Sequence, residues 1–177
     1  FELGSEWQQQ SGIVSSTSQP YKRLATDKII NYGDLLIMDV GGRFNGYMGD
    51  LTRTWWMGKG VTTPPKELVK LHTRVMNAMK HAESIVKPGV LNTEIAQACG
   101  EENILHGGLG HSLGLANESP AIGLYAEPTK VEAGMVFSIE PYAGIPGMGG
   151  FRLEDNILVT ETGHELLTGT MTSFRKL

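Results

Sequence analysis

Residues 35–50 read Leu-Leu-Ile-Met-Asp-Val-Gly-Gly-Arg-Phe-Asn-Gly-Tyr-Met-Gly-Asp, an apolar run of strand length followed by glycines and polar residues. The apolar part predicts a strand. Asn45-Gly46 is a dipeptide that favours a tight hairpin turn, and residues 47–57 mix aromatic and β-branched side chains with polar ones, as a return strand does. The stretch therefore predicts a β-hairpin that carries two carboxylates, Asp39 and Asp50.

A helical pattern follows the hairpin. Pro64-Pro65 opens a segment in which apolar residues recur at steps of three and four up to Val86, and Lys87-Pro88-Gly89 ends it. A second, shorter helix is expected from Asn92 to about Ala98, after which glycine-rich chain continues to Gly114. The patterns predict two helices joined by a turn.

The remaining segments predict strands and turns. Strands are expected at residues 135–139 and 152–160, the second after a turn at Gly147–Gly150. Residues 1–34 are polar and mixed, which indicates loop or irregular strand. Hairpins on either side of helices predict an α+β fold in which a layer of helices covers an antiparallel sheet.

Length, charge and cysteine content limit the classes of function. The 177 residues suit a single domain with a full hydrophobic core. The formal net charge of −4 and the lack of a basic run argue against nucleic acid as a partner. The apolar runs are too short to span a membrane, so no membrane partner is expected. One cysteine, Cys99, permits no internal disulfide and suits the reducing cytoplasm.

Five side chains are candidates for chemistry because each is an oxygen or imidazole donor within, or at the end of, an apolar strand-like run. They are Asp39, Asp50, His111, Glu140 and Glu154. A buried carboxylate without a partner would cost several kcal/mol or lose its charge, and a cation removes that penalty. Four carboxylates and one imidazole suit manganese, the preferred ion here, or cobalt, zinc or iron. They are more donors than one ion needs, so we expect two ions, which supply a nucleophile at neutral pH.

Each of these side chains taken alone has an ordinary structural explanation. A carboxylate can cap a turn or pair with an arginine, and a histidine can be satisfied in the core. The metal interpretation therefore rests on all five together. Arg53 and Arg152 each neighbour a candidate ligand, and either could orient that carboxylate or form an ordinary ion pair.

Four ordered motifs resemble those of the pita-bread metallopeptidases, which include Xaa-Pro aminopeptidases, prolidases and methionine aminopeptidases. The segment from Asp39 to Asp50, with Leu-Thr-Arg-Thr after it, is similar to the first metal motif of that family. Gly110-His111-Ser-Leu-Gly-Leu resembles the histidine motif. Met-Val-Phe-Ser-Ile-Glu140-Pro and Gly-Phe-Arg-Leu-Glu154-Asp resemble the two glutamate motifs, with the spacing of the prolidase and Xaa-Pro branch.

The resemblance implies a pita-bread fold, a curved antiparallel sheet covered by helices. It implies that residues 1–177 are one catalytic domain, and, because the chain begins with Phe1, that N-terminal helices or an N-terminal domain are missing from it. The implied activity is cleavage of Xaa-Pro peptide bonds by a dinuclear metal centre. The implied partner is a small peptide or other small-molecule substrate, and a homodimer is compatible with the family.

The resemblance also implies a role for each candidate residue. Asp39 would chelate one metal ion, and Asp50 and Glu154 would bridge both ions. His111 and Glu140 would complete the second ion, and Glu140 would handle the proton of the attacking water. Glu140 and His111 are therefore the expected catalytic residues.

The sequence departs from the family pattern at two positions. Active peptidases of the family carry a histidine where this chain has Glu118, and another near the position of Lys22. A single hydrogen-bond donor to the negative charge that develops in the transition state typically lowers the activation barrier by about 2.7–4 kcal/mol. Three alternatives therefore stay open: a lyase similar to dimethylsulfoniopropionate lyases, a non-peptide amidohydrolase, and a catalytically inactive peptide-binding module. Asn117 argues against the lyase, because an amide stands where those enzymes carry the proton-abstracting carboxylate.

Overall fold

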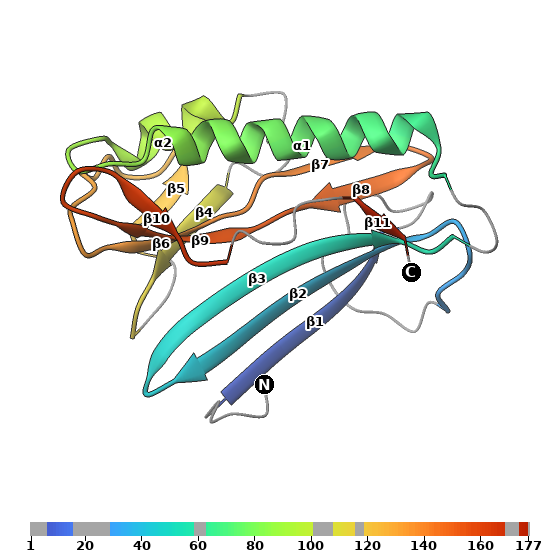
Figure 1. Cartoon of the computed structure of the whole chain (residues 1–177), viewed down its shortest axis with the longest axis horizontal. Helices are drawn as coiled ribbons and strands as arrows, with labels where there is room; N and C mark the ends of the chain where they lie inside the picture. Colours follow the sequence, from blue (N-terminus) through green and yellow to red (C-terminus); the bar gives the residue numbers. More distant parts are fainter. Residues whose placement is uncertain are drawn as a thin grey trace.

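The computed structural model describes residues 7–15, 29–58, 63–100, 108–115, 119–168 and 174–176. Two helices and eleven strands occur in these ranges (Figure 1). In chain order they are β1 (Trp7–Ser15), β2 (Leu35–Phe44), β3 (Tyr47–Trp56), α1 (Lys66–Ser84), α2 (Asn92–Ala98), β4 (Gly108–Leu113), β5 (Ala121–Gly123), β6 (Val136–Ile139), β7 (Tyr142–Ile145), β8 (Gly149–Arg152), β9 (Asp155–Val159), β10 (His164–Leu166) and β11 (Arg175–Lys176).

The predicted hairpin is confirmed. β2 and β3 pair antiparallel along their whole length and are joined by a two-residue turn. Asn45 and Gly46 form this turn with φ angles of 49° and 83°, the left-handed conformation that asparagine and glycine adopt most readily. The first strand is longer than its apolar run, because Gly41 and Gly42 continue the ladder opposite Asp50 and Gly49.

Two larger sheets and one small sheet make up the β-structure. Their strand orders are β1-β2-β3-β11, β10-β9-β6-β4-β5 and β7-β8, and only the short β11 is parallel to its neighbour among these pairs. β1 corrects the expectation of loop or irregular strand for its segment. Its polar sequence shows no alternation, but its backbone pairs with the free edge of β2 in regular register from Trp7 opposite Arg43 to Ser15 opposite Leu35.

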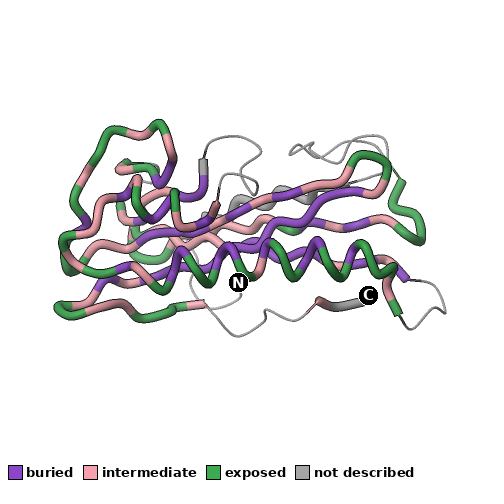
Figure 2. The backbone as a smooth tube through the Cα atoms, turned by 90° about the horizontal axis from the view of Figure 1, so that it is seen from above, coloured by how far each residue is buried: buried purple, intermediate pink, exposed green. Residues whose placement is uncertain are grey.

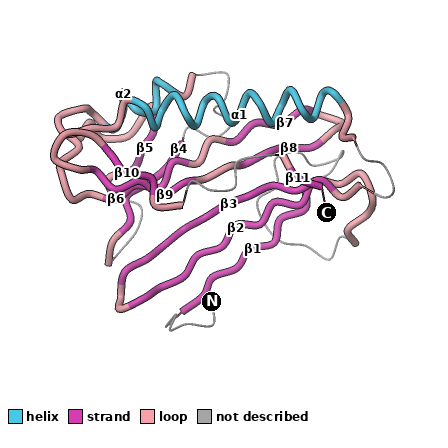
Figure 3. The backbone as a smooth tube through the Cα atoms, viewed as in Figure 1, coloured by secondary structure: helices cyan, strands magenta, loops and turns pink. Residues whose placement is uncertain are grey.

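The helices occur where the apolar spacing predicts them. α1 buries one face, and Figure 2 shows buried and exposed residues alternating along this helix. The helix ends at Ser84, and the N–H groups of Ile85 and Val86 form a last tight turn. α2 begins after Leu91, whose N–H donates to the Glu94 carboxylate at 2.8 Å. Figure 3 shows both helices on one side of the sheets.

The glycine-rich segments contain more strand than the sequence predicts. β4 runs through the glycine-rich chain before Gly114, for which the sequence predicts no element, because its glycines carry no side chains and so hide the alternation. The turn expected at Gly147–Gly150 is earlier and shorter, since Gly149 already belongs to β8. The strand expected at residues 152–160 is divided between β8 and β9. Glu154 lies in the break between them.

The two larger sheets meet along β3, the strand that carries Asp50. The N–H of Glu154 donates to the carbonyl of Thr52 at 3.1 Å, and the N–H of Met48 donates to the carbonyl of Gly114 at 2.9 Å. These bonds join the hairpin to the chain around β4, β8 and β9. The apolar core, with Phe137, Phe151 and Ile157 fully buried, lies between this junction and α1. No helix in the described ranges is long and apolar enough to cross a membrane.

Candidate metal centre

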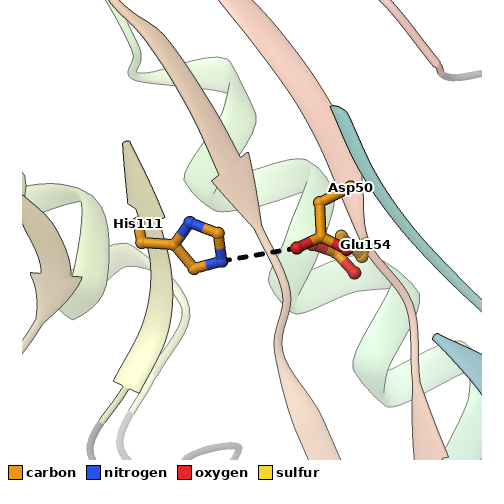
Figure 4. Close-up of side chains that lie close together, drawn as sticks. All are labelled: Asp50, His111 and Glu154. Atoms are coloured by element: carbon orange, nitrogen blue, oxygen red, sulfur yellow. Dashed lines mark ion pairs between the residues drawn. The ribbon is translucent and has the colours of Figure 1, made fainter. Parts of the chain in front are cut away.

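Three of the five predicted ligands converge at the junction of the sheets. Asp50 comes from β3, His111 from β4 and Glu154 from the break before β9, and one donor atom of each lies within 4.8 Å of the other two. Figure 4 shows the two carboxylates side by side with the imidazole pointing at them. Two strands and the break before β9 thus supply three donors that lie close enough together to share a small cation.

The ring of His111 presents its Nε2 to the carboxylates. Nδ1 lies 3.1 Å from the carbonyl oxygen of Ser112, which accepts a hydrogen bond from the tautomer protonated at Nδ1. In the neutral ring Nε2 then keeps its lone pair. Nε2 is 3.7 Å from Oδ2 of Asp50 and 3.8 Å from Oε1 of Glu140. A lone pair aimed at two carboxylates is the arrangement of a histidine ligand.

Glu154 is fully buried and held by two hydroxyl groups. Thr52 Oγ1 donates to Oε2 at 2.5 Å, and Ser138 Oγ donates to Oε1. Each carboxylate oxygen accepts one hydroxyl and keeps a second lone pair for another partner. The side chain is therefore fixed in direction before any ligand binds.

Glu140 and Asp39 lie beside this group and are linked by Arg152. One terminal nitrogen of the guanidinium, Nη2, forms an ion pair with Oε2 of Glu140. The other, Nη1, lies 3.3 Å from Oδ2 of Asp39. Oε1 of Glu140 lies beside His111, a member of the group formed by Asp50, His111 and Glu154. Asp39 is not one of the three residues whose donor atoms lie within 4.8 Å of one another.

The electrostatics of the site favour a bound cation. Burial, together with the carboxylates of Glu154 and Asp39, raises the pKa of Asp50 to about 7, while Arg152 lowers it. A divalent cation would remove both the repulsion between carboxylates and the cost of burying them. Carboxylate oxygens and one imidazole nitrogen form the hard donor set of manganese, cobalt, zinc or iron sites. The residues present fit such an ion.

Two supporting residues were not among the predicted site residues. Thr52 and Ser138, the hydroxyl donors to Glu154, each stand two positions from a predicted ligand, Asp50 and Glu140 respectively. Side chains two positions apart on a strand point to the same face of the sheet. The sequence therefore places Thr52 and Ser138 on the faces that carry the ligands, and this could have identified them.

Some predicted features fall elsewhere. Lys22, Asn117 and Glu118, where the sequence departs from the family pattern, lie outside the described residues. A separate hollow of about 690 Å³ is lined by α1, including Arg74, by the end of α2 and by Cys99 after it; none of the five candidate ligands lines this hollow.

The fold and the arrangement of donors define a class of metal-dependent hydrolases. The sequence profile of metallopeptidase family M24 matches residues 6–161, and the chain belongs to that family. The Xaa-Pro dipeptidase of Pyrococcus furiosus is 37% identical over 155 residues, which are 83% of this chain and 43% of that protein. The chain spans about half the length of the curated relatives it matches.

Solved structures show the same fold. The prolidase from Pyrococcus horikoshii OT3 superposes with a TM-score of 0.83 at 34% identity, covering 95% of this chain and 50% of that one. An Xaa-Pro dipeptidase from Bacillus anthracis gives a TM-score of 0.86 at 28% identity, covering 99% and 51%. The predicted pita-bread fold and family are thereby confirmed.

Proposed function

We propose that this chain is the catalytic domain of a metal-dependent peptidase that cleaves Xaa-Pro bonds in small peptides. The observation that carries the proposal is the convergence of Asp50, His111 and Glu154 within 4.8 Å, in a chain similar to proteins named Xaa-Pro dipeptidase. A metallopeptidase needs donors from separate segments of the chain to meet in one place, whereas an ordinary ion pair needs only two charged groups.

The proposed centre holds two divalent ions, with manganese preferred and cobalt, zinc or iron as alternatives. Asp50 and Glu154 would bridge the ions, and Asp39 would bind one of them. His111 and Glu140 would bind the other. The number of carboxylate oxygens supports two ions, because five side chains offer more donors than one ion uses.

When bound, such ions polarise the scissile carbonyl and make water acidic enough to act as a nucleophile near neutral pH. The chain's own residues supply positions and proton transfer. Glu140, held on one oxygen by Arg152, accepts the proton of the attacking water and returns it to the leaving nitrogen. His111, held through Nδ1 by the Ser112 carbonyl, keeps its lone pair directed at the reaction site.

Three further assignments belong to the same proposal. Residues 1–177 act as one catalytic domain, which the shared use of both sheets by one site supports. The protein works in the cytoplasm, which the presence of a single cysteine supports. A homodimer is compatible with the family, and size-exclusion chromatography with light scattering tests it directly.

Activity assays test the function. The Mn²⁺-loaded chain should hydrolyse Xaa-Pro dipeptides, and Glu140→Gln should slow the reaction by at least about 100-fold while leaving the fold intact, because general acid–base catalysis is typically worth that much. Glu165→Gln, on the exposed edge strand β10, is the matched control and should change nothing. Metal binding without turnover of any Xaa-Pro peptide would favour a lyase or amidohydrolase. A chain that binds peptides but no metal would be a binding module.

A further inference from the structure

A buried ion pair lies directly behind Glu154, outside the candidate metal centre. Nη2 of Arg53 is 2.6 Å from Oδ1 of Asp155, and the two side chains are 6% and 1% exposed. A buried ion pair contributes little to stability on average, because removing both charges from water offsets their attraction. Stability alone therefore does not explain why this ion pair lies beside Glu154.

Arg53 holds the backbone on both sides of the junction between the sheets. Its Nη1 donates to the carbonyl oxygen of Glu154 and, at 2.9 Å, to that of Thr52. Thr52 is also the residue whose hydroxyl donates to the Glu154 carboxylate. One guanidinium nitrogen thus fixes both the backbone of a proposed metal ligand and the backbone of the residue that orients it.

Asp155 and Thr168 complete this arrangement. Oδ1 of Asp155 also accepts from the Thr168 hydroxyl at 3.0 Å, and that hydroxyl accepts from the N–H of Asn156 at 2.7 Å. The carbonyl of Thr168 accepts from Nη2 of Arg53 at 3.3 Å. The segment after β10 is thereby tied to the two residues that follow Glu154.

We propose that Arg53, Asp155 and Thr168, here called the Glu154 brace, are positioning residues that set the affinity of the centre for divalent metal. The inference rests on the proposed function, since it requires that Glu154 bind metal. Arg53 holds the carbonyl of Glu154 directly, and it also holds the Thr52 carbonyl that accepts the N–H of Glu154, so the Glu154 carboxylate stays directed at Asp50 and His111. With the brace loosened, the break between β8 and β9 relaxes and the carboxylate must be repositioned on each binding event.

The test measures Co²⁺ binding to the full chain by calorimetry and by the visible absorption of the bound ion. Asp155→Asn should weaken binding by about 10- to 100-fold, the usual effect of losing a partner of a metal ligand, and should alter the Co²⁺ spectrum. Arg53→Lys should weaken binding by less than Asp155→Asn, because lysine keeps the charge but reaches fewer of the acceptors. Thr168→Val removes one hydroxyl and leaves no charge unpaired. If Asp155→Asn does not fold, this variant tests whether the brace affects metal affinity.

Thr160→Val is the matched control. Its hydroxyl accepts from the N–H of Gly163 at 3.1 Å in the neighbouring turn and touches no brace residue. The proposal predicts weaker Co²⁺ binding and a changed spectrum for Thr168→Val and wild-type values for Thr160→Val. If the folded brace variants bind Co²⁺ with wild-type affinity and the wild-type absorption spectrum, the proposed role of the brace is wrong, but the proposed function still stands. A wild-type chain that binds no Co²⁺ would overturn the proposed function and the brace with it.

Discussion

Arg152 lies between two candidate ligands that come from different sheets. It pairs with Asp39 of β2 and with Glu140 after β6, so one guanidinium neutralises carboxylates on both sides of the junction. It also lowers the pKa of Asp50, which burial and the other carboxylates raise. The residue thus sets both the positions and the charge balance of the site.

Replacing Arg152 by glutamine should therefore lower activity and metal affinity. We expect a loss of about 10- to 100-fold in kcat/KM for Xaa-Pro dipeptides, because the two carboxylates lose their common partner. Arg152→Lys should recover only part of the loss, since lysine cannot contact both carboxylates with separate nitrogens. Wild-type kinetics in Arg152→Gln would contradict this role.

Glu83, buried on the inner face of α1, is a second carboxyl with a raised pKa. Its Oε1 has no hydrogen-bond partner in the part of the chain that the structure describes. Burial and the charge of Asp155 raise its pKa from 4.5 to about 7, although Lys80 and Arg53 lower it. Because the folded pKa lies above the unfolded one, the stabilising contribution is full below pH 4.5 and is lost as the pH rises through 7.

Glu83→Gln should remove this pH dependence. The difference in unfolding free energy between this variant and wild type should shift by about 2 kcal/mol in favour of the variant from pH 5 to pH 8, because the buried charge is gone. Urea unfolding at both pH values measures the difference. Glu165→Gln, whose side chain is exposed, serves as the control. An equal change at both pH values would show that folding does not change the pKa of the Glu83 carboxyl.

At the scale of elements, β4 is where the sequence predicts least and the site depends most. Gly110 has a φ of 153°, and a Cβ at this position would overlap the carbonyl oxygen of Ser138 on β6. The two strands approach closely there, which places His111 opposite Ser138. Glycine at residue 110 is thus a condition for the position of the imidazole.

Gly110→Ala should destabilise the fold by roughly 2–5 kcal/mol, combining overpacking with backbone strain. Denaturant unfolding measures the loss. Gly163→Ala is the matched control, because a Cβ there meets no atom within 4 Å. If Gly110→Ala were as stable as Gly163→Ala, the result would contradict the close approach of β4 to β6 at Gly110.

An element can be predicted from the sequence when neighbouring residues determine it, and not when a distant strand does. The hairpin and α1 are determined by nearby residues, the Asn45-Gly46 turn and the spacing of apolar side chains, and both were predicted. β1 and β4 form because a distant strand offers a free edge, which no local pattern records. The ligand types could be chosen from sequence because a carboxylate after an apolar run requires a partner, whereas the links through Arg152 and Thr168 depend on tertiary contacts.

At the scale of the molecule, the site exists because two sheets meet along one strand. β3 gives Asp50 to the centre and, through Thr52, bonds to the backbone and the carboxylate of Glu154. Neither sheet alone holds a complete set of donors: Asp39 and Asp50 belong to one, and His111 to the other. The central claim is that this junction holds a pair of divalent metal ions.

Crystals of the chain grown with Mn²⁺ test this claim most directly, through an anomalous difference map. The account predicts two peaks about 3.5–4 Å apart, both in contact with Asp50 and Glu154. A single peak, or none between these carboxylates, would contradict it.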